Sequence, residues 1–497
     1  MKILLVRPPF TRLRKFGQSP VFPLGLGWIA AVLSHRGHQA MIYYPENPSG
    51  EEQQYEVHKE SVFENRSAAH SRYLDALNND SLPVWREIRE QIGAYAPDVL
   101  GISLLSTEVG AALKVSRIAK ALSPEMLVVW GGVHPSFETE SSLAFPEVDL
   151  VVRGEGEFTM LDICDRLEHG QRLDDVAGIS LRCGTRVRHN PDRPLLDDLD
   201  TLPPPSRDLV LQEHTFSKEA LGGVITSRGC PWRCSFCSSR SFWRNTVRFR
   251  SPRAVADEIE ALKRDKDIRS VTIWDDAFSL DRDHALSLCQ ELLDRRLRIT
   301  WRGATRLDLI NPGLLRLMRR SGCTQVEIGI ESGSPRILRE IRKDIEIDSV
   351  QEAISAVQAE GMACGVFFMA GFPQERIEDL EETLNVMRRI TPAEMVLNVY
   401  DPLPGSELFE LARAWSMVSR DEDWVDYRLW PLRHFVKDID PEEFANRIEE
   451  ISAFVFSYNR SIGPLLRRAL PEVKRLLARD PARLLRKAGR FLANRFH

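Results

Sequence analysis

Three cysteines are the residues of this chain whose type and spacing point most directly to chemistry. Cys230, Cys234 and Cys237 form the pattern C-x3-C-x2-C, directly after a short apolar segment, Gly223–Thr226, that is expected to be a strand. Thiolates are soft ligands that suit iron–sulfur clusters and zinc. A structural zinc site needs a fourth Cys or His at close spacing, and none follows Cys237 closely. The spacing therefore favours a [4Fe–4S] cluster with one iron left open to another molecule.

Length and composition describe an ordinary globular protein. At 497 residues the chain is too long for one hydrophobic core and predicts about three domains. Its hydrophobic content is 43% and its charged content 28%, both typical of soluble domains. No apolar run approaches a membrane-spanning length, and the N-terminus opens as a strand, not a signal peptide. Because clustered cysteines also fit a reducing compartment, we expect a cytoplasmic protein.

The first part of the chain alternates apolar strand segments with helical segments. Strands are expected at residues 2–6, 40–44, 99–103, 127–130 and 149–152, with a polar and mostly helical insertion at 46–90. Such alternation predicts a doubly wound, Rossmann-like parallel sheet. Ligands of these sheets bind at the carboxyl ends of the strands.

A second alternation follows a proline-rich connector. Strands are expected at residues 223–227, 270–274, 298–302, 325–330, 365–370 and 395–400. Six βα units predict a partial (β/α)6 barrel, whose functional loops follow the strands. The three cysteines follow the first of these strands. The chain is therefore expected to contain a Rossmann-like domain (1–170), a linker (171–217), a partial TIM barrel (218–405) and a mainly helical extension (406–497).

The cysteine motif, placed after the first barrel strand, resembles that of radical S-adenosylmethionine (SAM) enzymes, in which the open iron chelates SAM. The resemblance implies a SAM pocket at the ends of the following strands. Asp275 and Asp276 come after the second strand. At this strand end, members of the family present backbone and acidic groups to the SAM amino group. Arg306 comes after the third strand. Glu331 and Ser332 lie at the end of the fourth, where the carboxylate of Glu331 would accept hydrogen bonds from the ribose hydroxyls.

Small residues at the strand ends of the first domain carry a second resemblance, to the cobalamin-binding domain. A Ser-x-Leu follows the third strand and a Gly-Gly the fourth, and the residues so assigned are Ser103, Leu105, Gly131, Gly132, His134, Gly154 and Glu155. The Asp-x-His-x-x-Gly loop, whose His ligates cobalt in some cobalamin proteins, is missing, and Arg7-Pro-Pro-Phe10 stands in its place. The resemblance thus implies cobalamin with its base detached and no His ligand from that loop. A Rossmann-like domain with another ligand, or with none, is the alternative.

Together the two parts resemble the cobalamin-dependent radical SAM family over about residues 1–420. The resemblance implies three cofactors: a [4Fe–4S] cluster, SAM and cobalamin. It implies cleavage of SAM to a 5′-deoxyadenosyl radical and transfer of a methyl group from methylcobalamin to an unactivated carbon of a small-molecule or lipid substrate. An enzyme that forms or contracts rings, as the anaerobic cyclase of magnesium-porphyrin esters does, is one alternative, with a porphyrin ester or hopanoid-type substrate. A non-catalytic cobalamin or iron–sulfur sensor is the other. The sequence does not indicate which residue positions or quenches the substrate radical.

Positive charge is concentrated at the C-terminus. The segment 461–497 holds ten basic residues and two acidic ones, whereas the whole chain has a net charge of −5. Leucines interleave with these charges at helical intervals, so the segment is expected either to lie on an anionic membrane or to pack on the protein with a solvated basic face. The expected partners are the substrate, an electron donor such as flavodoxin or ferredoxin, and a membrane surface through this tail, but no nucleic acid.

Overall fold

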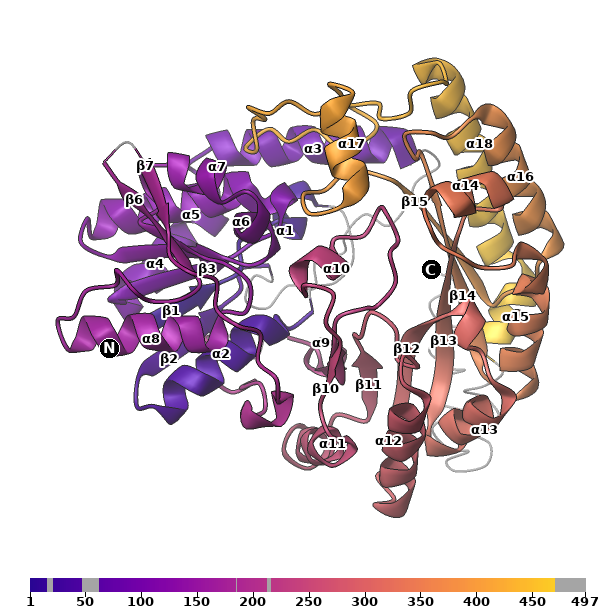
Figure 1. The fold of residues 1–497 in the computed structure, drawn as a ribbon, viewed down its shortest axis with the longest axis horizontal. Helices are drawn as coiled ribbons and strands as arrows, with labels where there is room; N and C mark the ends of the chain where they lie inside the picture. The colour runs from indigo at the N-terminus through magenta and orange to yellow at the C-terminus, as the bar shows by residue number, and fades with distance from the viewer. Residues whose placement is uncertain (16–20, 47–61, 185, 212–215, 470–497) are drawn as a thin grey trace. The chain divides into compact units, whose positions relative to one another are not determined.

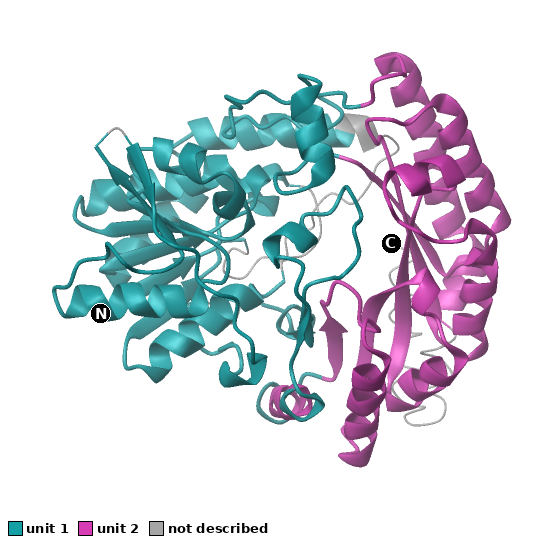
Figure 2. Ribbon diagram, in the orientation of Figure 1, with its two compact units in different colours: residues 1–254, 264–268, 401–435 teal, residues 255–263, 269–400, 436–497 magenta. Residues whose placement is uncertain are grey.

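The computed structural model describes residues 1–15, 21–46, 62–184, 186–211 and 216–469 (Figure 1). The chain forms two compact units, coloured separately in Figure 2. Unit 1 contains residues 1–254, 264–268 and 401–435, and unit 2 contains residues 255–263, 269–400 and 436–497. Unit 1 thus combines the N-terminal residues with a late segment of the chain, 401–435.

Unit 1 contains a seven-stranded sheet in the order β2-β1-β3-β4-β5-β6-β7. The sequence predicts its five parallel strands: β1 (Lys2–Val6), β2 (Gln39–Tyr43), β3 (Val99–Ser103), β4 (Leu127–Gly131) and β5 (Leu150–Val152). Their apolar residues are buried, as parallel strands covered on both faces require. Helix α2 (Leu24–His35) packs beside α8 (Glu157–Glu168), and α4 (Pro83–Tyr95) packs beside α5 (Val109–Leu122). The doubly wound domain is confirmed.

Two further strands of this sheet lie in the segment that was expected to be a linker. β6 (Ile179–Cys183) pairs antiparallel with β5, and β7 (Arg186–His189) pairs antiparallel with β6. The prediction missed them because they are short and rich in polar residues, as edge strands often are.

The remaining elements of unit 1 are short, apart from α3. They are α1 (Thr11–Arg14), α3 (Val62–Asn78), η1 (Ser106–Glu108), α6 (Val133–Phe137), α7 (Thr139–Ala144), η2 (Leu199–Thr201), α9 (Lys218–Leu221), β8 (Gly223–Val224), β9 (Ser227–Arg228), α10 (Ser239–Phe242), β10 (Arg248–Phe249) and α17 (Glu407–Ala414). The expected strand at 223–227 is thus divided into β8 and β9. The second piece pairs antiparallel with β10.

The segment 401–435 returns to unit 1 through its aromatic side chains. Phe409 is fully buried, and Trp424, Tyr427 and Phe435 are nearly so. All four belong to the hydrophobic core that also contains Trp85 of α4 and the adjacent face of the sheet. Burial of aromatic rings contributes strongly to a core, so this segment is part of the N-terminal fold and not of a separate extension.

Unit 2 is built on parallel strands in the order β15-β14-β13-β12-β11. These are β11 (Ser270–Ile273), β12 (Thr300–Arg306), β13 (Cys323–Glu331), β14 (Ala363–Ala370) and β15 (Glu394–Val399). Helix α11 (Pro252–Lys266) precedes β11. The other helices lie between or after the strands: α12 (Arg282–Asp294), α13 (Pro312–Ser321), α14 (Pro335–Glu340), α15 (Val350–Ala359), α16 (Ile377–Arg389) and α18 (Pro441–Arg460), with short turns η4 (Leu307–Leu309) and η5 (Ile347–Ser349). The expected βα series is present.

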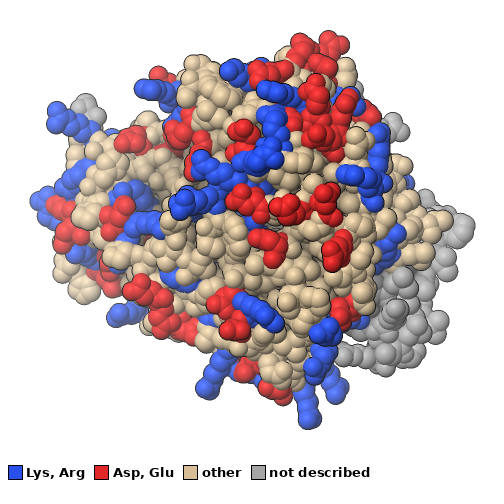
Figure 3. Space-filling model, turned by 45° about the vertical axis from the view of Figure 1, so that its right-hand side comes forward, with Lys and Arg blue, Asp and Glu red and all other residues tan. Residues whose placement is uncertain are grey.

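Surface charges are mixed in sign: basic and acidic side chains intermingle on the face drawn in Figure 3. Among the described residues, no helix is long and apolar enough to cross a membrane. Residues 470–497 lie outside the described part of the chain, and most of the expected basic tail with them. At its described start, Ile462 and Leu466 are 76% and 54% exposed.

The aromatic return segment leads to a stability prediction. Phe409→Ala should lower the free energy of unfolding of unit 1 by about 3–5 kcal/mol, because it leaves a cavity in the core. Leu403→Ala in the same segment should cost less than about 1 kcal/mol, since Leu403 is 42% exposed. Urea denaturation of the full-length protein measures both values. Equal, small losses would show that the segment is not part of this core.

Candidate active site

The three cysteines lie in one loop of unit 1. The loop begins at Gly229, whose φ of +99° and close approach to the Thr246 carbonyl oxygen, 2.1 Å from where a Cβ would lie, exclude a side chain. Cys230, Cys234 and Cys237 are all partly exposed. The Cys237 amide donates to the Cys234 carbonyl at 3.1 Å, which turns the chain back on itself. All three thiols are therefore within reach of a cofactor.

The Cys237 thiol accepts a hydrogen bond within its own loop. The Ser239 amide donates to the Cys237 Sγ at 3.4 Å, a contact that stabilises a thiolate.

The other cysteines differ in environment. Burial raises the pKa of Cys164 to about 12, of Cys289 to about 11 and of Cys364 to about 12. Buried thiols of this kind are not reactive. Cys183 differs from them, because it is exposed at the end of β6.

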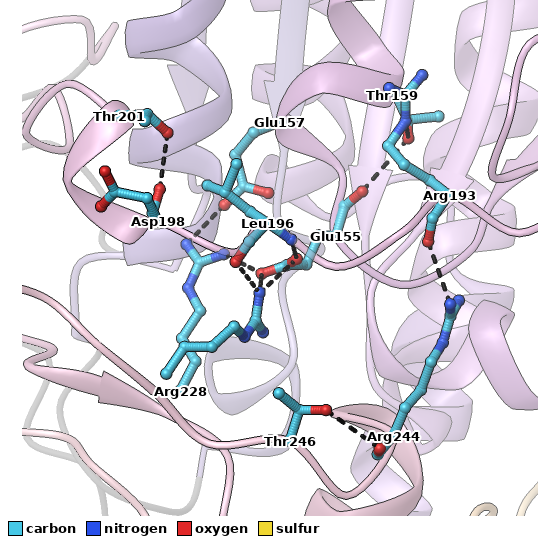
Figure 4. Close-up of polar contacts among 11 residues, drawn as sticks. Glu155, Glu157, Thr159, Arg193, Leu196, Asp198, Thr201, Arg228, Arg244 and Thr246 are labelled. Atoms are coloured by element: carbon cyan, nitrogen blue, oxygen red, sulfur yellow. Dashed lines mark hydrogen bonds and ion pairs between the residues drawn. The ribbon is translucent and has the colours of Figure 1, made fainter.

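A buried ion network connects the strand before the cysteine loop to the loop after β5 (Figure 4). Arg228 of β9 donates to Glu155 Oε1 at 2.6 Å and to Glu157 Oε1 at 2.7 Å. Arg248 of β10 donates to the two oxygens of Glu155 at 3.0 and 2.9 Å, and the Leu196 amide donates to Oε2 at 2.9 Å. Arg228, Glu155, Glu157 and Arg248 expose at most 8% of their side chains.

The network determines the ionisation of Glu155. Burial alone would raise the pKa of Glu155, but the hydrogen bond from Arg248 and the charge of Arg228 hold that pKa below its ordinary value. The carboxylate is therefore charged, and both of its oxygens are occupied by protein donors. Glu155, which the sequence assigns to the cobalamin site, is in the structure bound by Arg228 and Arg248 on either side of the cysteine loop. Arg228 and Arg248 were missed, because nothing in the sequence pairs them with this loop.

The small residues expected to bind cobalamin lie together at the carboxyl edge of the unit 1 sheet. Gly132 has a φ of +96°, and a Cβ there would lie 2.9 Å from Ser103 Oγ and 3.0 Å from the Leu104 carbonyl oxygen. The Leu104 amide donates to the Gly131 carbonyl at 3.0 Å. The loops after β3 and β4 therefore approach each other closely. A bulky residue at 132 would disturb this approach directly.

Two more residues of that set lie on the same edge. Leu105 is 42% exposed although it is apolar, and Gly154 has a φ of +72° and donates its amide to Ser136 Oγ at 2.9 Å. Small side chains with an exposed leucine beside them leave the edge open to a planar cofactor. These residues fit a cobalamin site.

His134, also assigned to the cobalamin site by the sequence, is buried. Its ring is 1% exposed, its Nδ1 lies 3.0 Å from Ser106 Oγ, and its ring centroid is 4.8 Å from that of Trp424. Burial lowers the pKa of His134 to about 3, so the imidazole is neutral. His134 thus positions the loop after β4 and is covered by the return segment.

In unit 2, Glu331 ends strand β13 in a constrained conformation. It has a φ of +69° at a register shift between β13 and β14, and its Oε1 accepts from Lys343 Nζ at 2.8 Å. A Cβ on Gly329 would lie 2.3 Å from that Oε1, so the glycine makes room for the carboxylate. The described residues donate no hydrogen bond to Oε2. One oxygen is fixed and the other is available to a ligand.

Arg306 meets the same lysine from the neighbouring strand. Its Nη2 donates to the Lys343 carbonyl at 2.7 Å, and its Nε donates to Asp308 Oδ1 at 2.9 Å. Lys343 is therefore a shared support for Glu331 and Arg306. Sequence reasoning missed it, because Arg342-Lys343-Asp344 has the composition of a solvated loop.

The other three expected SAM residues occupy different environments. Asp275 is buried and Asp276 exposed directly after β11. Ser332 is completely buried, its Oγ lies 3.2 Å from Thr383 Oγ1 of α16, and it accepts from the Ser334 amide at 3.1 Å. Ser332 therefore has two partners within the protein and orders the loop after β13.

The loop after β14 contains an acid that the sequence did not single out. Glu375 is completely buried, and its Oε2 accepts from the Gly371 amide at 2.5 Å. Burial raises the pKa of Glu375 to about 8, so it carries a proton at neutral pH. A neutral acid closes this loop without placing a charge in the core.

Comparisons with known proteins identify two domains in this chain. The chain matches the B12 binding domain over residues 17–163 and the Radical SAM superfamily over residues 224–387. It is 29% identical to an uncharacterized methyltransferase of Pyrococcus horikoshii, over 88% of this chain and 89% of that protein. It is 31% identical to the anaerobic magnesium-protoporphyrin IX monomethyl ester cyclase of Rubrivivax gelatinosus, over 68% and 62%.

The fold is similar to that of a solved structure as well. The radical S-adenosylmethionine methyltransferase TsrM from Kitasatospora setae superposes with a TM-score of 0.66 over 92% of this chain and 89% of that one, at 15% identity. The two domains occur in one chain, in the order that the sequence predicted. The chain belongs to the cobalamin-dependent radical SAM enzymes. The expected family, fold class and cofactors are confirmed.

The buried ion network gives a prediction. Glu155→Ala should lower the free energy of unfolding of unit 1 by about 3–5 kcal/mol, because it leaves buried guanidinium groups without a counter-charge. Iron content after reconstitution should fall too, since Arg228 lies two residues before Cys230.

The matched control is Asp267→Asn, in an ion pair with Lys218 whose side chains are both 58% exposed. It should cost less than about 1 kcal/mol. Urea denaturation and iron analysis provide the measurements. If Glu155→Ala is as stable as the control, the network is not what holds the cysteine loop.

Proposed function

We propose that this enzyme transfers a methyl group to an unactivated carbon of a small molecule. When bound, the cluster supplies the electron that cleaves SAM, and cobalamin supplies the methyl group. The observation that carries the proposal is the partly exposed C-x3-C-x2-C loop, held by buried charges to a sheet edge of small residues. Similarity to the Pyrococcus horikoshii methyltransferase along most of both chains supports methyl transfer.

In this proposal the residues of the chain divide into binding and positioning roles. Cys230, Cys234 and Cys237 hold the cluster, and Glu331 accepts hydrogen bonds from the SAM ribose through its free oxygen. Ser103, Leu105, Gly131, Gly132 and Gly154 form the cobalamin edge, with His134 and Glu155 as supports behind it. Asp275 and Asp276 face the SAM amino group. Arg306 and Ser332 act mainly by ordering the strand ends.

Ring formation or contraction is the second candidate, supported by the similarity to the Rubrivivax gelatinosus cyclase. That match covers 62% of the cyclase, less than the methyltransferase match covers. We also propose that the substrate is a lipid and that the basic tail contacts the membrane. The electron donor is a flavodoxin or a ferredoxin. The exposed Ile462 and Leu466 at the start of the tail suit an apolar contact.

Replacing any one of the three clustered cysteines with Ala should abolish formation of 5′-deoxyadenosine, because the cluster loses a ligand. Cys183→Ala should have no effect, since Cys183 is exposed and outside the loop. The measurement is anaerobic reconstitution followed by quantification of iron, sulfide and 5′-deoxyadenosine. Unchanged iron and sulfide in the triple variant would refute the cluster assignment. With SAM labelled in its methyl group, label in the product separates methyl transfer from ring chemistry.

Glu331→Gln should weaken SAM binding by about 1–3 kcal/mol, because a charge-assisted hydrogen bond becomes a neutral one. The cluster should stay intact. Glu327→Gln, four residues earlier on the same strand, is the control and should leave SAM affinity unchanged. Equilibrium binding of SAM to the reconstituted proteins measures the difference. Equal affinity in both variants would place the ribose contact elsewhere.

A further inference from the structure

Unit 1 contains a cavity of about 190 Å³ at the carboxyl edge of its sheet, which we name the ring cavity. Of the residues that line it, Phe10 follows β1, and Thr107 belongs to η1, shortly after β3. The same edge carries Ser103 and Gly132, which are assigned to cobalamin. A cavity of about 150 Å³ is enough for benzene, so the ring cavity has room for a six-membered ring with a substituent.

Aromatic side chains form much of the wall of the ring cavity. Tyr73 comes from α3, and Trp424, Tyr427 and Trp430 come from the return segment, residues 401–435. The ring centroids of Trp424 and Tyr427 lie 4.7 Å apart. Flat apolar walls favour a planar, apolar ligand over a branched or strongly hydrated one.

The charged side chains of the wall all have partners within the protein. Arg66 forms an ion pair with Asp401, and His70 is paired with Asp426 at 3.0 Å. Arg14 lies 4.9 Å from the centroid of an aromatic ring of the same wall. A charged ligand would have to disrupt one of these contacts, and separating a buried pair is costly. The ring cavity therefore suits an uncharged ligand.

The ion pair of Arg66 and Asp401 has room for one hydroxyl group. Arg66 Nη1 lies 3.9 Å from Asp401 Oδ2, too far for a direct hydrogen bond. Among the described residues, Arg66 donates no hydrogen bond and this Oδ2 accepts none. A hydroxyl is both an acceptor and a donor, so it can accept from Arg66 and donate to Asp401 without disturbing the charge balance.

The carboxylate of Asp401 is fixed in place for this role. Its Oδ1 accepts from the Trp430 amide at 2.7 Å. Burial raises the pKa of Asp401 to about 6, so the group is still ionised at pH 7. Oδ2 is thus held as an acceptor at the wall of the cavity.

The ring cavity also has an exit. Leu432 belongs to its wall and is 43% exposed, so the wall reaches the surface of unit 1. A chain attached to a bound ring can leave the cavity at this point.

We propose that the ring cavity binds an uncharged aromatic ring with one hydroxyl group, and that this hydroxyl bridges Arg66 and Asp401. A lipid whose head group is a phenol belongs to this class. The inference rests on the proposed function and narrows its substrate. The detached base of cobalamin is an uncharged planar ring too, although it has no hydroxyl, and the experiment separates these two sources.

The probes are 4-fluorophenol and 4-fluorotoluene, which share a ring and differ by a hydroxyl in place of a methyl group. They are titrated into the full-length protein, reconstituted with cluster and hydroxocobalamin, and binding is followed by fluorine NMR. The phenol should bind about tenfold more tightly, because its hydroxyl gains hydrogen bonds to charged groups. 4-Fluoroanisole accepts but does not donate, and should bind no more tightly than 4-fluorotoluene.

Variants locate the site. Asp401→Asn keeps an acceptor for the Trp430 amide but loses the one at Oδ2, so the preference for the phenol should fall to about threefold or less. Leu432→Trp, at the exposed mouth, should weaken both probes at least fivefold with little risk to folding. The matched control is Arg86→Met on α4, whose side chain is 73% exposed; it should bind both probes as the wild type does.

The wild-type protein alone makes the outcome decisive, so a folding defect in a variant does not leave the question open. Equal affinity for 4-fluorophenol, 4-fluorotoluene and 4-fluoroanisole would overturn the proposal, and so would unchanged binding in Leu432→Trp. Protein with and without cobalamin should bind the phenol alike. Binding that occurs only without cobalamin would assign the cavity to the base of the cofactor and overturn the proposal as well.

This test is independent of turnover. If the phenol binds as described but labelled SAM transfers no methyl group to any product, the proposed function fails and the ring site remains. If methyl transfer occurs and the probes bind alike, the proposed function remains and the assignment of the cavity fails.

Discussion

Buried charges need partners, and this requirement organises unit 1 around Glu155. A carboxylate removed from water is stable only when donors surround it, and here Arg228, Arg248 and the Leu196 amide provide them. The two arginines lie opposite each other on β9 and β10. Both strands are two residues long, so their position depends on the carboxylate more than on their own pairing. The cysteine loop continues directly from β9, so the position of the loop depends on the Glu155 carboxylate too.

In unit 2, the carboxylate of Glu331 is also held in place, partly by the conformation of its own backbone. Glu331 adopts a left-handed conformation that costs energy for a residue with a side chain, and Lys343 and Gly329 compensate for it. Lys343 neutralises the carboxylate, and Gly329 leaves the space that it occupies. Strain at a strand end of this kind is typical of positions where a side chain must be aimed at a ligand. In both units a carboxylate at a strand end is fixed by a cation from a later part of the chain.

The sequence predicted the parallel strands and the cysteine loop because both depend on local patterns. Apolar runs between helical segments identify β1 to β5 without any knowledge of their neighbours, and C-x3-C-x2-C is a short-range motif. The polar hairpin β6–β7 has no such pattern. The partners of Glu155 and Glu331 are distant in sequence, and Lys343 looks like any loop lysine. Ser332, His134 and Glu155 were correctly placed at strand ends, but only the structure shows that their polar atoms contact the protein itself.

The return of residues 401–435 to unit 1 has a consequence for biosynthesis. A ribosome releases the seven strands of the first sheet long before it releases Phe409, Trp424 and Tyr427, which complete the core beside α4 and α5. Until then the nascent domain presents an incomplete apolar face, the kind of surface that chaperones recognise and that aggregates when left uncovered. Maturation of the N-terminal half is thereby made dependent on synthesis of the entire barrel. A chain interrupted within the barrel would be left with an unfinished first domain, and quality control could remove it before any cofactor was committed to it.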